Sequence, residues 1–130
     1  MKLRIHGNSI RLRLTRSEVA RFTETGKIEA TLQFGPGAAQ RMTYGLETDP
    51  GISGLRASGS AEHLIIRVAT EIAKEWTSTD RVAISDEQSA NGAAAVSILV
   101  EKEFRRLHGA KYNPDLYPNP LEETLASAGK

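Results

Sequence analysis

The chain has 130 residues, a formal net charge of +1 and no cysteine. A chain of this length fits one domain and buries a core without covalent cross-links. The lack of cysteine excludes disulfides, thiolate zinc sites and cysteine nucleophiles, and it suits a reducing compartment. The N-terminus has no signal-peptide pattern, and no apolar run is long enough to cross a bilayer. We therefore expect a cytoplasmic protein with no membrane partner.

The charge is unevenly distributed along the chain. Residues 1–27 contain seven Lys or Arg and two Glu, a balance of +5, whereas residues 28–130 contain ten basic and fourteen acidic side chains, a balance of −4. The whole protein is not a strongly basic nucleic-acid binder, but its first segment is basic.

Residues 2–6 and 10–14 alternate between apolar and polar side chains, as half-buried strands do. A Gly-Asn-Ser break separates the two runs and predicts a tight hairpin. Its apolar face contains Leu3, Ile5, Ile10, Leu12 and Leu14. Its solvent face contains Lys2, Arg4, His6, Arg11 and Arg13.

The sequence from Thr15 to Glu18 fits a capping box, in which the Thr15 hydroxyl and the Glu18 carboxylate cap the first turn of a helix. Leu14 and Val19 are spaced as a hydrophobic staple. Gly26 suits a left-handed C-cap, so we predict a short helix that ends there.

The rest of the chain predicts more short strands and a second helix. Strands are expected at residues 28–34, around 42–46, and at 55–57, 63–68, 81–85 and 96–104, with a helix at 70–77. Turn clusters stand at residues 35–37, 49–54 and 90–92.

The order of elements repeats, which predicts two ββαββ units at residues 2–48 and 56–103. An offset of 54 positions superposes Arg13-Leu14 on Arg67-Val68, Phe22 on Trp76 and Lys27-Ile28 on Arg81-Val82; with a slip of one residue, the helix at Ser17–Arg21 meets Thr70–Lys74. Such repeats close their apolar faces against each other. Any two strand-helix-strand segments share similar spacing, so true duplication stays open.

The predicted fold class is mainly β (α+β), a barrel-like single domain over residues 1–108 with two short helices. Phe22 and Trp76 are expected to plug the barrel. Residues 109–130 predict an extended arm rich in Pro and Tyr, followed by a flexible tail.

The run from Gly7 to Thr15, followed by a capped helix and a further hairpin, resembles the AbrB/MazE-type swapped-hairpin barrels, which are small bacterial regulators and antitoxins. The resemblance covers about residues 2–103 and implies two ββαββ units that exchange hairpins. It departs from the family where Thr15 and Ala69 replace a usual proline, and in longer loops at 35–40 and 88–94.

The chain also resembles a family of uncharacterised small bacterial proteins. The resemblance rests on the Gly7-Asn8-Ser9 start and on the segments Leu99–Phe104 and Tyr117–Pro120. That family implies no activity.

The swapped-hairpin resemblance implies that the outer face of the first hairpin contacts DNA. The candidate nucleic-acid-binding residues are Lys2, Arg4, Arg11 and Arg13. A competing interpretation is structural, because solvent-facing strand positions must be polar and charges there also block edge pairing. Whichever holds, phosphate contacts are measurable through their salt dependence.

Other motifs predict no catalysis. His6, His63 and His108 lack metal-ligand spacing, so we predict no metal. Asp86, Glu87, Glu101 and Glu103 flank the last hairpin, where paired carboxylates can do acid-base work, but they are expected to face solvent. Gly35-Pro36-Gly37 lacks the Lys and Ser/Thr of a phosphate loop, so no cofactor is expected.

We therefore predict a non-catalytic, regulator-like module that binds DNA through its basic hairpin. The alternative is a protein-interaction or antitoxin-like module whose arm, from Tyr112 to Pro120, wraps a partner in extended form. An enzyme that uses the barrel mouth is a third possibility, for which no nucleophile and base pair is evident. The sequence leaves the oligomeric state open.

Overall fold

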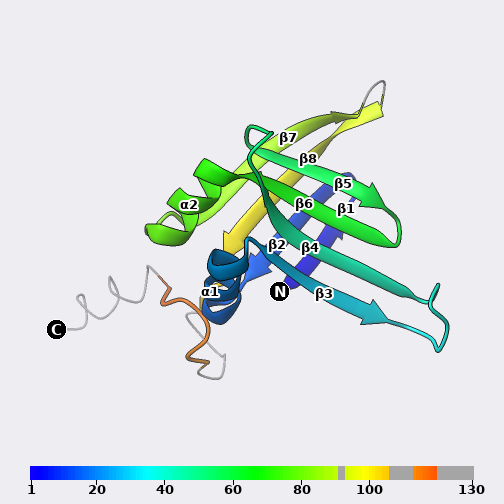
Figure 1. Cartoon of the computed structure of the whole chain (residues 1–130), viewed down its shortest axis with the longest axis horizontal. Coiled ribbons are helices and arrows are strands. Elements are labelled where there is room, and N and C mark those ends of the chain that lie inside the picture. The colour runs from blue at the N-terminus through cyan, green and yellow to red at the C-terminus, as the bar shows by residue number, and fades with distance from the viewer. Residues whose placement is uncertain (91–92, 106–112, 120–130) are drawn as a thin grey trace.

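The computed structural model describes residues 1–90, 93–105 and 113–119. Within these residues, two four-stranded sheets face each other and two helices lie together at one end of them (Figure 1). None of the helices in the described part of the chain is both long and apolar enough to span a membrane.

The elements follow the predicted order of two ββαββ units, and the fold is of the expected α+β class. The first unit contains β1 (Lys2–His6), β2 (Ser9–Leu14), α1 (Arg16–Thr25), β3 (Lys27–Gln33) and β4 (Arg41–Asp49). The second contains β5 (Leu55–Ser60), β6 (His63–Ala69), α2 (Thr70–Ser78), β7 (Ala83–Ala90) and β8 (Ala93–Lys102).

The two units exchange hairpins. One sheet has the order β1-β2-β8-β7 and the other has the order β3-β4-β6-β5, so each sheet combines one antiparallel hairpin from each unit. The hairpins meet through parallel central pairs, β2 with β8 and β4 with β6. Neither unit can complete a sheet alone, which makes the units interdependent.

When 54 is added to the residue numbers of the first unit, the strand pairs of one sheet coincide with those of the other. Lys2 pairs with Arg13 as Arg56 pairs with Arg67. Across the central pairs, Arg13 lies opposite Glu101 as Arg67 lies opposite Glu47. The equivalence includes both helices without a slip, because Val19 and Phe22 are buried in α1 as Ala73 and Trp76 are in α2. The one-residue slip expected in the helix is therefore wrong.

The offset changes to 56 at β7. Ile28 pairs with Leu46, and its counterpart Ile84 pairs with Val100. The expected superposition of Ile28 on Val82 is therefore wrong by two residues, which are inserted between α2 and β7. This insertion also explains why β7 begins at Ala83, two residues after the predicted start.

The predicted barrel is not closed in the described structure. Between β5 and β7, side chains replace a backbone ladder: Asp86 Oδ2 accepts from Leu55 N at 2.9 Å, and the Gln88 amide bonds Ala57 N at 2.6 Å and Ala57 O at 3.1 Å. Between β1 and β3, the described residues form no ladder at all. The fold is a sandwich with one bridged seam and one open seam.

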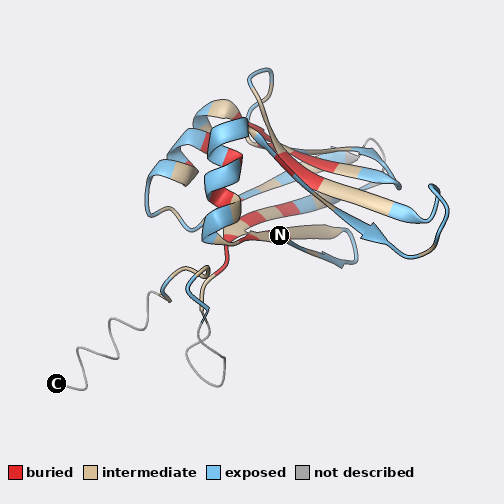
Figure 2. Ribbon diagram, turned by 60° about the horizontal axis from the view of Figure 1, so that its bottom comes forward, coloured by how far each residue is buried: buried red, intermediate tan, exposed pale blue. Residues whose placement is uncertain are grey.

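The predicted aromatic plug is present in the core of the sandwich, although the described strands form no closed barrel around it. Phe22 and Trp76 are 1% and 0% exposed, and their rings meet edge to face with centroids 6.3 Å apart. Trp76 Nε1 donates to Val82 O at 3.0 Å, which satisfies the buried indole N–H. Figure 2 shows buried positions along the inner faces of both sheets and on the sides of the helices that meet them.

The two helices begin differently. In α1 the predicted capping box is present, and Thr15 N donates to Glu18 Oε1 at 2.9 Å. The helix ends at Gly26, whose φ of 74° is left-handed as expected. In α2 the N-cap is Ala69, which has no side-chain acceptor.

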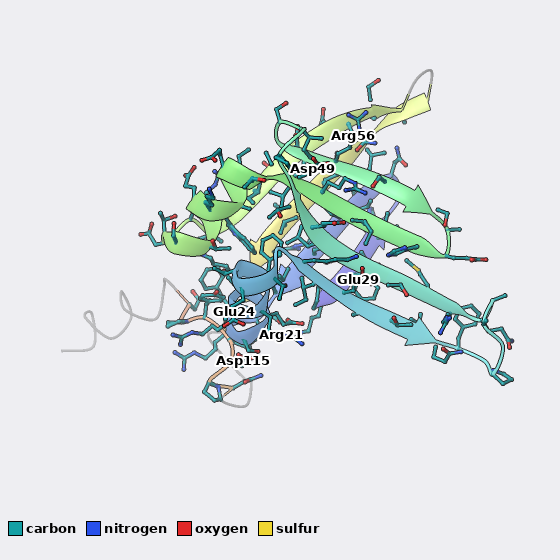
Figure 3. The ribbon with its side chains drawn as sticks, in the orientation of Figure 1. Arg21, Glu24, Glu29, Asp49, Arg56 and Asp115 are labelled. Carbon is teal, nitrogen blue, oxygen red and sulfur yellow. The ribbon has the colours of Figure 1, made fainter. Side chains whose placement is uncertain are left out.

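The C-terminal segment Asn113–Asn119 packs on its own domain. Asp115 lies at the start of α1, where its carboxylate accepts from Ser17 N at 2.9 Å and Ser17 Oγ at 2.7 Å (Figure 3). Tyr117 N donates to Glu103 O at 2.9 Å, and its ring contacts Phe104. The ends of the predicted partner-binding arm, Tyr112 and Pro120, lie outside the described residues.

Candidate functional site

The four predicted basic residues come together on the outer face of the β1-β2 hairpin. The turn at Gly7, with φ of 54°, sets the register in which Lys2 pairs with Arg13 and Arg4 pairs with Arg11. Adjacent cross-strand pairs on one face are close neighbours. The four side chains and Leu3 line a hollow of about 310 Å³, which we call the basic hollow.

Two carboxylates lie on the same surface. Glu101 belongs to β8, and Glu103 is the first residue after that strand. Glu101 Oε1 lies 2.6 Å from Arg11 Nη2 and 2.6 Å from Arg13 Nε. Lys2 pairs with Glu103. The sequence placed these two glutamates on a solvent face and did not pair them with the basic hairpin. They reach it because β2 and β8 are parallel neighbours, a long-range pairing that no local pattern reveals.

Arg4 differs from the other three basic residues. It is exposed, and within the described residues it forms no ion pair. The basic hollow therefore combines one unpaired arginine, two arginines that share a single carboxylate, and a paired lysine. The net charge of these four basic residues with Glu101 and Glu103 is +2, so the surface still attracts anions.

Comparison with the second sheet shows which of these charged residues recur at equivalent positions. The Arg13–Glu101 pair has a counterpart in Arg67 and Glu47, whose side chains lie 3.7 Å apart. Arg4 and Arg11 have no basic counterparts, since Ser58 and Ile65 occupy the equivalent paired positions. The arginine opposite glutamate is thus common to both sheets, whereas Arg4 and Arg11 are particular to the first.

A shallow groove continues from the basic hollow across the same sheet. It has a volume of about 690 Å³ and runs over β2, β8 and β7. Its lining side chains include Ser9, Arg11, Ser85, Glu87, Ser97 and Leu99. Its hydroxyls and one arginine suit hydrogen bonding to a polar ligand, and Asp86 and Glu87 add two carboxylates to the lining.

The histidines are not gathered into a site. His6 is on the outer face of β1, and His63 Nε2 lies 3.8 Å from Glu29 Oε1. The Lys27 ammonium beside Glu29 is the main cause of the lowered pKa of that carboxyl. His108 lies outside the described residues. Among the residues that are described, no group of three or more His, Asp or Glu could hold a metal ion.

The structure also contains a buried lysine that the sequence did not single out. Lys102 is 6% exposed, and its Nζ donates to Thr79 O at 2.7 Å. The same Nζ lies 5.8 Å from the Trp76 ring centroid and 5.6 Å from that of Tyr117. Burial lowers the pKa of Lys102. Because carbonyl and ring contacts hold the ammonium in place, Lys102 joins α2, β8 and the C-terminal segment.

The comparisons with known proteins identify the family and nothing further. Neither a curated protein nor a solved structure matches the chain. Residues 1–121 match the family described as "Family of unknown function (DUF7009)". This agrees with the expected membership of an uncharacterised family of small proteins. The match covers most of the chain, so the protein belongs to the DUF7009 family.

Proposed function

We propose that the protein is a non-catalytic DNA-binding module whose basic hairpin contacts the phosphate backbone. The observation that carries this proposal is the basic hollow, in which Lys2, Arg4, Arg11 and Arg13 surround one opening. Lys and Arg supply the sequence-independent part of DNA affinity by neutralising phosphates. A two-stranded ribbon also fits the major groove.

Arg4 and Arg11 give the strongest support. The equivalent positions of the second sheet hold Ser58 and Ile65, so the fold forms without basic side chains there. Arg13 pairs with a glutamate that has a counterpart in the second sheet, so the fold itself can account for it. Arg4 and Arg11 have no such counterparts, and they are therefore better functional candidates. Arg4 and Arg11 are therefore the main phosphate ligands in the proposal.

The hairpin exchange adds a second line of support. Two ββαββ units that combine their hairpins into shared sheets are the arrangement implied by the resemblance to AbrB/MazE-type swapped-hairpin proteins. In that family the outer face of such a hairpin contacts DNA. The assignment to a regulator of this type belongs to the same proposal.

Glu101 limits the affinity that the basic hollow can reach. Its carboxylate already accepts from Arg11 and Arg13, so a phosphate must compete for both guanidinium groups. We expect weak binding that decreases steeply with salt. Removal of this competing charge in Glu101→Gln should tighten binding.

The test is a fluorescence anisotropy titration with mixed-sequence duplex DNA at low and moderate salt. Arg4→Ala and Arg11→Ala should each weaken binding and reduce the slope of log K against log salt by about 1. Arg56→Ala and Arg67→Ala are the matched controls on the second sheet and should leave binding unchanged. Absence of binding at low salt, or equal losses from both sheets, would refute the proposal.

The alternative function, capture of a protein by the arm, is less well supported by the geometry. In the described part of the arm, Asp115 and Tyr117 are bonded to α1 and Glu103. A partner would first have to displace these contacts.

A further inference from the structure

The two seams of the sandwich occupy equivalent places but are built differently. The offset that relates the units places β1 on β5 and β3 on β7, so the β1/β3 seam corresponds to the β5/β7 seam. Asp86 and Gln88 bridge the second seam by bonding the backbone of Leu55 and Ala57. The equivalent residues of the first seam are Ala30 and Leu32, which have no side-chain donor or acceptor.

The open seam leaves the edge of β1 available. In a hairpin with a two-residue turn, the residue pair next to the turn, His6 and Ser9, is hydrogen-bonded, and the bonded pairs then alternate. The backbone N–H and C=O groups of Leu3 and Ile5 therefore point away from β2. The corresponding groups of Ala57 are the ones that Gln88 satisfies.

Apolar side chains are exposed around this seam. Ile5 is 58% exposed, Leu32 is 56% exposed and Phe34 is 63% exposed. Ile5 lies on the same face of β1 as the half-buried Leu3, and Leu32 lies on the same face of β3 as the buried Ile28. Ile5 also borders a cleft of about 500 Å³ that lies between the β1-β2 turn and the β5-β6 hairpin, and no residue of β3 lines it. The exposed side chains of Ile5, Leu32 and Phe34 are therefore the apolar surface that an added strand would cover.

We propose that the β1 edge binds an extended peptide segment of a partner protein as an added strand, with apolar side chains alternating with acidic ones. A peptide backbone supplies the donors and acceptors that Asp86 and Gln88 supply at the other seam. Its inward side chains cover Ile5, Leu32 and Phe34. Its outward side chains lie beside Arg4, so carboxylates complement them.

A second copy of the chain fits this edge less well. Antiparallel pairing of β1 with β1 of another molecule would place Lys2 and Arg4 of one copy beside the same residues of the other. Like charges directly opposite each other on neighbouring strands are destabilising. The occupant is therefore a different, acidic segment.

The test uses a fluorescein-labelled synthetic peptide of about six residues in which valine alternates with glutamate. We expect saturable binding by anisotropy, and amide hydrogen exchange at Leu3 and Ile5 should slow when the peptide is present. The same peptide with lysine in place of glutamate should bind at least about tenfold more weakly. A form with N-methyl groups on one backbone edge should not bind.

Two variants connect binding to the seam. Ile5→Pro removes an amide that faces the free edge and not β2, so the fold should survive while peptide binding is lost. Phe34→Ser should weaken binding about tenfold, and Val82→Ser is the matched control, because Val82 is an exposed apolar residue away from the seam. Circular dichroism checks that each variant is folded.

Three outcomes would overturn the inference: no binding of the acidic peptide, binding indifferent to N-methylation and to Ile5→Pro, or self-association of the protein through β1 in light scattering. Phe34→Ser should leave DNA binding unchanged, and Arg11→Ala should leave hydrogen exchange at Leu3 and Ile5 unaffected. The peptide site and the proposed DNA site can therefore fail separately.

Discussion

The two ββαββ units have the same strand pairing and the same helix positions, yet they differ at three places besides the insertion before β7 and the arginines of the β1-β2 hairpin. The aromatic plug is Phe22 in one unit and Trp76 in the other. One seam is bridged by Asp86 and Gln88, and the other is open. One helix is capped by side chains, and the other begins at Ala69. Features that both units share are those that the fold requires, so the differences indicate where other roles can reside.

The largest expected effect concerns the aromatic pair. Phe22→Ala and Trp76→Ala should each lower the free energy of unfolding by about 3–5 kcal/mol, because a cavity replaces a fully buried ring. Trp76→Ala should cost more, since it also removes one of the two hydrogen bonds that Val82 O accepts and the ring beside Lys102. Urea denaturation followed by circular dichroism measures both.

Trp76→Phe separates these contributions. It keeps an aromatic ring but loses the indole donor, so it should cost less than Trp76→Ala. If Phe22→Ala proved the more damaging change, the indole hydrogen bond and the contact with Lys102 would not add to the stability that ring burial provides.

The seam difference predicts a smaller effect. Asp86→Ala and Gln88→Ala should each destabilise the protein by about 1–3 kcal/mol, because partly buried backbone groups of Leu55 and Ala57 lose their partners. Chemical denaturation gives the free energies, and hydrogen exchange at β5 should increase in both variants. Glu87→Ala is the control, since Glu87 is exposed and lies between them on β7. Equal effects from all three would show that the side-chain bridge does not hold the seam.

The sequence was sufficient for elements that depend on neighbouring residues. Alternation identified the β1-β2 hairpin, and the capping box and Gly26 identified α1 with both ends. The offset of 54 predicted two units of the same order. Local signals worked because the side chains that define a strand face or a helix end lie within a few residues of each other.

Long-range contacts were beyond the sequence. Glu101 looked like a solvent residue, because nothing near it shows that β8 lies parallel to β2. The β1/β3 seam is open because Ala30 and Leu32 have no side-chain groups that could form the hydrogen bonds of Asp86 and Gln88. This difference is visible only when the two seams are superposed. The candidate site was therefore predicted by residue type and position, but its charge balance was not.

The helix caps provide the smallest expected effect, a stabilisation that is present near neutrality and lost in acid. The Ser17 hydroxyl and backbone N–H both donate to Asp115, and they hold the pKa of that carboxyl below its ordinary value. A carboxyl whose pKa is lower in the folded state stabilises the fold above its unfolded pKa, and this stabilisation disappears as the pH falls through the folded pKa. Wild type should therefore be more stable than Asp115→Asn near neutrality, and the two should converge in acid. Urea midpoints measured across pH test this. Glu24→Gln is the control, because Glu24 is an exposed carboxyl on α1 (Figure 3). A constant difference at every pH would mean that Asp115 acts through shape and not through its charge at the start of α1.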